Sequence, residues 1–140
     1  MIIPYQTTSG MECFIMPAQP IHKNWVIATC YDSYLHKHKT LNLKYADTLI
    51  KKLLGAYPTL VLESDSNPTK ESSIGWVCGD KSNLVYVYIN PVFRQMGCAT
   101  DLLNILILSQ EVDVHLSTPN GKLLLSSFSK LHNDIKITYK

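Results

Sequence analysis

The fold is decided by residues 89–99, Ile89-Asn90-Pro91-Val92-Phe93-Arg94-Gln95-Met96-Gly97-Cys98-Ala99, where a β-rich segment passes through a turn into an apolar helix. The preceding residues 83–89 (NLVYVYI) are rich in β-branched and aromatic side chains and alternate as a pleated strand does. Pro91 ends that strand because it has no N–H to donate, and residues 101–106 take up helical spacing. The sequence therefore predicts a strand, a turn and a helix in direct succession.

The start of this helix is a candidate anion site. The first N–H groups of a helix have no partner within it, and the positive end of the helix dipole lies there. Small residues at positions 97–100 let a pyrophosphate approach these groups closely. The alternative is an ordinary junction in which Gly97 only permits a tight turn. The strand before the turn and the helix after it favour the anion site.

The turn also resembles a known motif. Arg94-x-x-Gly97-x-Ala99, preceded by an apolar strand and by Phe93, is similar to the acyl-CoA-binding motif of the GNAT superfamily of N-acyltransferases. The resemblance implies acetyl-CoA as co-substrate and transfer of its acetyl group to a primary amine of a small molecule or protein. It implies cofactor contacts from these residues: Tyr88, Ile89, Arg94, Gln95, Met96, Gly97, Cys98, Ala99, Thr100 and Asn120. Arg94 would add charge or brace the loop, and Asn120 could instead be a helix N-cap.

The other elements follow from hydrophobic periodicity and turn signals. Strands are predicted at 11–16, 59–63, 74–78, 83–89, 112–116 and 135–139, and helices at 21–38, 43–55, 101–106 and 120–131. The three central strands should form an antiparallel meander, and a crossover should bring 112–116 parallel to 85–89. This α/β order, a mixed, mostly antiparallel sheet flanked by helices, resembles the GNAT fold over a single domain, residues 1–140. The family usually has a further C-terminal strand that is not found before Lys140, so either the sheet ends early, or another segment or a second protomer covers that edge. A second protomer at this edge would make a homodimer.

Composition narrows the class of protein. The 140 residues are 46% hydrophobic and 17% charged, which describes a globular domain, and a net charge of +2 does not predict nucleic-acid binding. Neither a signal peptide nor a membrane-length apolar run is visible, so a cytoplasmic location is expected. The four cysteines are widely spaced without a Cys-x-x-Cys pair, so they are predicted to be buried hydrophobes and no metal is expected.

Acetyl transfer asks for a base and an acid. Many family members carry a tyrosine acid in the last helix, but Phe128 stands at the corresponding position and cannot donate a proton. Ser127 beside it could orient the thiolate. His115 on the strand after the motif is the candidate base, with a structural histidine as the alternative. Tyr86 and Tyr88 supply polar groups on one face of the motif strand, with aromatic packing as their alternative role.

Two functions are compatible with these residues. An active N-acetyltransferase could work mainly by positioning the amine against the thioester. A catalytically impaired GNAT-like domain could instead serve as a protein-binding or inhibitory module. Phe128 and the missing strand favour the second function, whereas the intact turn from Arg94 to Ala99 favours the first.

Glu63 is expected as a surface carboxylate that could face the substrate cleft, and the lysine excess in 21–55 permits an acidic partner.

Overall fold

The computed structural model describes residues 2–37, 43–69, 71–106, 108–132 and 135–140, which form one seven-stranded sheet with four α-helices. The strands are β1 (Ile3–Gln6), β2 (Glu12–Pro17), β3 (Thr59–Glu63), β4 (Ser73–Gly79), β5 (Asn83–Ile89), β6 (Glu111–Val114) and β7 (Lys136–Tyr139). The helices are α1 (Lys23–Lys37), α2 (Leu43–Ala56), α3 (Cys98–Leu106) and α4 (Pro119–Leu131), with short 3₁₀ turns η1 (Pro20–His22) and η2 (Pro91–Phe93).

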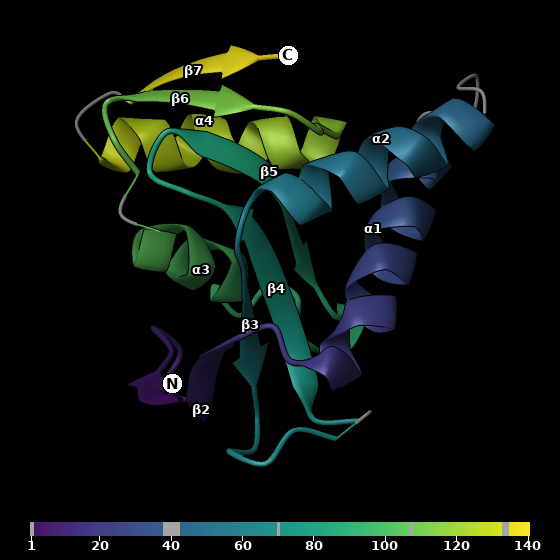
Figure 1. The fold of residues 1–140 in the computed structure, drawn as a ribbon. Coiled ribbons are helices and arrows are strands. Elements are labelled where there is room, and N and C mark those ends of the chain that lie inside the picture. The colour runs from purple at the N-terminus through teal and green to yellow at the C-terminus, as the bar shows by residue number, and fades with distance from the viewer. Residues whose placement is uncertain (1, 38–42, 70, 107, 133–134) are drawn as a thin grey trace.

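The sheet is mixed, and its strands follow one another in chain order. Pairing is antiparallel from β1 to β5, and the crossovers through α3 and α4 make β5, β6 and β7 parallel. Helices α1 and α2 cover one face, and α3 and α4 cover the other (Figure 1). The predicted fold class, a mixed, mostly antiparallel sheet flanked by helices, is confirmed.

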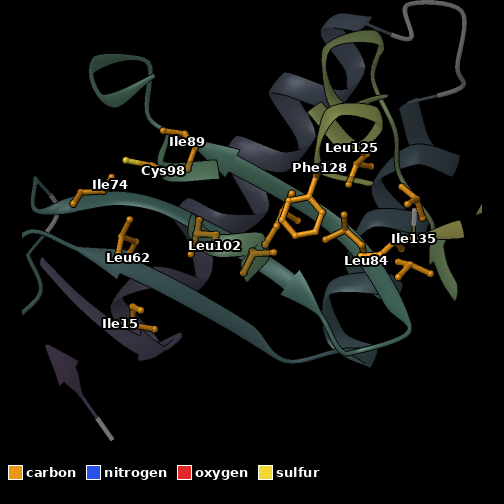
Figure 2. Close-up of a cluster of buried hydrophobic side chains, with 14 of the residues drawn as sticks. Ile15, Leu62, Ile74, Leu84, Ile89, Cys98, Leu102, Leu125, Phe128 and Ile135 are labelled. Atoms are coloured by element: carbon orange, nitrogen blue, oxygen red, sulfur yellow. The ribbon is translucent and has the colours of Figure 1, made fainter. Parts of the chain in front are cut away.

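Each face of the sheet has its own hydrophobic core, because successive strand residues point to opposite faces. In β4, Trp76 packs beneath the α1 and α2 layer, whereas its neighbour Val77 packs beneath α3 and α4. Figure 2 shows the core beneath α3 and α4, in which Leu102 of α3 and Phe128 of α4 pack with side chains of the strands. Both helical layers are therefore held through the sheet between them.

The sequence missed strand β1. Pro4 and the turn at residues 7–10 obscured a four-residue strand that pairs with β2 in the register Ile3↔Ile15. As the outermost strand, β1 tolerates a proline that a central strand would not. The other predicted elements are present, with boundaries shifted by a few residues; His38, the predicted end of the first helix, lies outside the described residues.

The cysteines are buried free thiols, as predicted. Burial raises the pKa of Cys30 to about 12 and the pKa values of Cys13 and Cys78 to about 11, so these thiols stay protonated. Among the described residues, no group of His, Cys, Asp and Glu side chains could hold a metal ion. None of the described helices is long and apolar enough to cross a membrane.

The surface position predicted for Glu63 is wrong. Glu63 has no exposed surface, and its carboxylate accepts hydrogen bonds from Ser72 Oγ and Ser73 Oγ at 2.6 Å each and from His22 Nε2. The Gln19 N–H donates to His22 Nδ1 at 2.9 Å, which leaves Nε2 as the donor to Glu63. This buried network joins η1 to the β3–β4 hairpin, so Glu63 is satisfied within the fold.

Candidate functional site

Strand β5 is paired along most of its length on one edge only. It pairs with β4 from Leu84 to Ile89, but its parallel pairing with β6 covers only Asn83 and Leu84. Two further hydrogen bonds follow, from His115 N to Leu84 O at 3.0 Å and from Leu116 N to Val85 O at 3.2 Å, and among the described residues the pairing of β5 with this neighbour stops there. Residues 86–89 therefore have an open edge.

The open edge offers main-chain hydrogen-bonding groups. Alternate residues of a strand direct these groups to the same neighbour, and Asn90 N donates to Ile74 O of β4, so Tyr88 also faces β4. The main-chain groups of Val87 and Ile89 consequently face the opening. Apart from the Ile89 carbonyl, which accepts from Arg94 Nε, these groups are free to pair with an extended, amide-containing ligand, as an added strand would.

A groove of about 260 Å³ follows this edge. It is lined by residues 86–89 of β5, by Arg94 and Ala99, by residues of α4 and its cap, and by Ser33 of α1. Neighbouring residues of β5 point to opposite faces, yet all four line the groove. The groove thus passes through the opening in the sheet and contacts both helical layers. A smaller cavity of about 30 Å³ continues it to Leu84 and Leu116, where the strands part.

The turn between β5 and α3 contains two left-handed residues, Gln95 (φ 65°) and Gly97 (φ 79°). Gly97 is favoured at its position by this φ and not by crowding, because a Cβ there would meet no atom within 4 Å. Helix α3 starts at Cys98, so the N–H groups of residues 98–100 have no partner one turn earlier. Open space and unpaired donors together suit an anion.

Arg94 acts as a brace in this structure. Its Nε donates to the carbonyl of Ile89 at 2.9 Å, and its guanidinium carbon lies 5.6 Å from the centre of the Tyr88 ring. Of the two roles considered for this side chain, bracing the loop is therefore the one observed. The Ile89 carbonyl, predicted to meet the cofactor, already has a partner.

The two tyrosines of β5 reach the groove from the α1 side. Tyr86 Oη lies 2.9 Å from Ser33 Oγ, and Ser33 Oγ also donates to Thr29 O at 2.6 Å, so Tyr86 is the donor to Ser33. Burial raises the pKa of Tyr86. Tyr88 stacks on Trp76 with ring centroids 6.3 Å apart, so it has both the packing role and a place in the groove.

The structure does not bring the other catalytic candidates to the groove. His115 Nε2 lies 3.1 Å from Asn83 Oδ1, and its ring packs 5.5 Å from the Tyr57 ring. Ser127 is exposed on α4 and does not line the groove. Phe128 is buried and stacks on His132 at 4.1 Å. The three proposed catalytic residues are Tyr88, His115 and Ser127, and of these Tyr88 is the one found among the described residues that line the groove.

Five of the predicted cofactor residues line the groove: Tyr88, Ile89, Arg94, Ala99 and Asn120. The other five, residues 95–98 and 100, form the adjoining turn and the start of α3. The alternative assignment of Asn120 as an N-cap is wrong. Thr118 caps α4, because its side chain accepts from Gly121 N at 3.1 Å.

Several lining residues were missed from the sequence. Thr118 followed by Pro119 is a recognisable helix start, and it could have placed the cap and Gly121 beside the groove. Leu124 lies one turn further along α4. Ser33 carries no sequence signal, because its place depends on how α1 crosses the sheet.

No protein-family model matches the chain, and no curated protein matches it in sequence. Among solved structures, a GCN5-related N-acetyltransferase described as aminotransferase, class-II, from Rhodopseudomonas palustris is similar over 74% of this chain and 65% of that chain, with 11% identity and a TM-score of 0.45. This chain thus spans less than two thirds of that protein. A ribosomal-protein-alanine N-acetyltransferase from Brucella melitensis biovar Abortus 2308 is similar over 90% and 80%, with 13% identity and a TM-score of 0.39. Likenesses this distant indicate nothing about the activity of this chain.

Proposed function

We propose that the protein is an N-acetyltransferase that moves an acetyl group from acetyl-CoA to a primary amine of a small molecule or protein. One observation carries the proposal: the open edge of β5 and the start of α3 border a single groove. A strand edge suits the amide-containing arm of CoA, and a helix start suits its pyrophosphate. The cytoplasmic location and the homodimer remain proposals as well.

The charge of the groove supports an anionic ligand. Arg94 is the one cationic side chain among the described lining residues, and no acidic side chain lines the groove. The main-chain N–H groups of residues 95–100 would hold the pyrophosphate, with Gly97 and Ala99 leaving room for it. The main-chain groups of Val87 and the Ile89 N–H would pair with the amides of the arm.

When bound, acetyl-CoA supplies a thioester that an uncharged amine can attack. The groove would hold the amine and the thioester in contact, which is the main contribution expected from these residues. As the amine nitrogen bonds to the acetyl carbon and the carbon–sulfur bond breaks, the nitrogen must lose a proton and the departing thiolate must gain one. We assign the donation to Tyr88, which lines the groove and whose phenolate would then take up the proton that the nitrogen loses. His115 and Ser127 remain proposed catalytic residues that lie outside the groove in this structure.

The first test is calorimetric titration with acetyl-CoA. The wild type should bind, and Gly97→Glu should weaken binding about a hundredfold or more, because it places bulk and negative charge at the anion site. Ala99→Glu should do the same without a left-handed backbone to strain. Gly55→Glu is the matched control, since Gly55 is exposed in α2 with open space around it. Absence of binding by the wild type would remove the proposal.

A catalytically impaired binding module is the second candidate. It is favoured by Phe128, which is buried where many family members have a tyrosine, and by the lack of a carboxylate or imidazole among the described lining residues. Release of free CoA in the presence of a panel of primary amines distinguishes the two. Binding that depends on Gly97, without turnover for any amine, would support the module.

A further inference from the structure

Asp101 lies in the first turns of α3 and is almost completely buried, with 1% of its surface exposed. Its carboxylate accepts hydrogen bonds from Thr8 Oγ1 at 2.7 Å, Tyr5 Oη at 3.1 Å and Thr8 N at 3.2 Å. All three donors come from the N-terminal hairpin, more than ninety residues away in the chain. The Asp101 side chain therefore joins α3 to the β1–β2 hairpin by hydrogen bonds, in addition to the core packing between them.

The hairpin turn is itself well ordered. Thr7 N donates to Met11 O and Gly10 N donates to Thr7 O, both at 2.9 Å. Thr7 Oγ1 also accepts from Met11 N at 3.0 Å, and Thr7 is 3% exposed. Each of these bonds holds the turn that presents Thr8 to Asp101. The hairpin groups that donate hydrogen bonds to the Asp101 carboxylate are thus held in place without a ligand.

Asp101 is linked in turn to the candidate anion site. Its own N–H donates to the carbonyl of Gly97 at 3.0 Å and so closes the first turn of α3. The unpaired N–H groups of residues 98–100 lie between these two residues. The Cys98 side chain is 2% exposed and packs in the core, which holds the same turn from below. Holding Asp101 in place therefore also holds the orientation of the N–H groups of residues 98–100.

The direction of the carboxylate fits a positioning role. Asp101 does not line the groove, so its negative charge is directed toward the hairpin and away from an incoming anion. A carboxylate near a helix start is also favoured by the dipole. Its charge contributes, after burial, to raising the pKa of Tyr5 and of Cys98, which keeps both neighbours neutral.

We infer that Asp101 is a positioning residue, through which the N-terminal hairpin pre-orders the anion-binding turn; this rests on the proposed function. Donors held in place before binding need no ordering when the ligand arrives, so affinity is higher. The hairpin is then a functional part of the cofactor site, although its strand β1 is separated from β5 by three strands of the sheet.

The test is the affinity for acetyl-CoA of Asp101→Asn, Thr8→Val and Tyr5→Phe, measured well below each melting temperature. Asp101→Asn should weaken binding about tenfold, and the two donor variants about threefold each. Thr29→Val is the matched control, because it removes the hydroxyl that Trp76 Nε1 contacts at 2.9 Å on the other face of the sheet. Exchange of the Asp101 amide hydrogen should accelerate in the donor variants and not in Thr29→Val.

The outcomes separate this inference from the proposed function. Unchanged affinity in folded Asp101→Asn and Thr8→Val, beside a wild type that binds, overturns the positioning role and leaves the proposed function intact. Equal weakening by Thr29→Val also overturns it, since general destabilisation would then be the cause. A wild type that does not bind acetyl-CoA overturns both. Weakened binding with faster exchange only in the three variants supports the inference.

Discussion

The two halves of strand β5 differ in what surrounds them. At Leu84 a strand lies on either edge, and the Val85 carbonyl still accepts from Leu116 N, whereas residues 86–89 pair with β4 and leave their other edge to the groove. The alternation of β-branched and aromatic residues continues across both halves. The sequence of a strand therefore sets its conformation, while the point at which its neighbour departs decides where main-chain groups become available to a ligand.

The largest expected difference between the halves is in packing. Val85 has no exposed surface, whereas Val87 is only partly buried beside the groove. Val85→Ala should lower the free energy of unfolding by about 2 kcal/mol, because it leaves a cavity between the sheet and α1. Val87→Ala removes the same atoms and should cost less than about 1 kcal/mol. Urea unfolding of both variants measures the difference, and equal losses would contradict it.

A second test concerns the Arg94 brace on the open half. Arg94→Lys keeps the positive charge but loses the Nε donor to the Ile89 carbonyl. The free energy of unfolding should fall by about 1 kcal/mol in Arg94→Lys and equally in Arg94→Met. Affinity for acetyl-CoA should fall further in the methionine variant, because only that variant loses the charge. A lysine variant as stable as the wild type would show that the brace contributes nothing.

A third test concerns the point where the halves meet. Tyr86→Phe removes the hydrogen bond to Ser33 and should cost about 1 kcal/mol at neutral pH. Burial raises the pKa of Tyr86 in the folded state, so its stabilising contribution is complete below the ordinary value of 10.0 and is lost as the pH rises through the folded pKa. The advantage of the wild type over Tyr86→Phe should therefore shrink in strong alkali. An advantage that is the same at every pH in urea unfolding would contradict this linkage.

Local sequence patterns were enough to predict much of the fold. The bounds of β3 and β5 agree with the alternation of their residues, and the turn from Arg94 to Ala99 lies beside a groove as its small residues suggested. Such features depend on neighbours in the chain. The point at which β6 parts from β5 could not be predicted in this way, because residues 112–116 alternate like a strand that continues beyond Val114, the last residue of β6.

The rest depends on partners distant in sequence. Glu63 was assigned to the surface because a carboxylate is seldom buried alone, and its donors His22 and Ser72 come from other elements. Asp101 resembled an ordinary polar residue in a first helical turn until the hairpin placed Thr8 against it. His115 was correctly placed next to β5, but alternation alone did not show that its side chain meets Tyr57 and not the groove.

The groove has a consequence for the folding unit as a whole. It takes Ser33 from the layer of α1 and α2, and Ala99 and Leu124 from the layer of α3 and α4. A bound molecule would contact both layers directly, in addition to the sheet that already joins them. Its binding free energy then adds to the cooperativity of the fold, and partial openings that release one layer alone become rarer in the loaded protein.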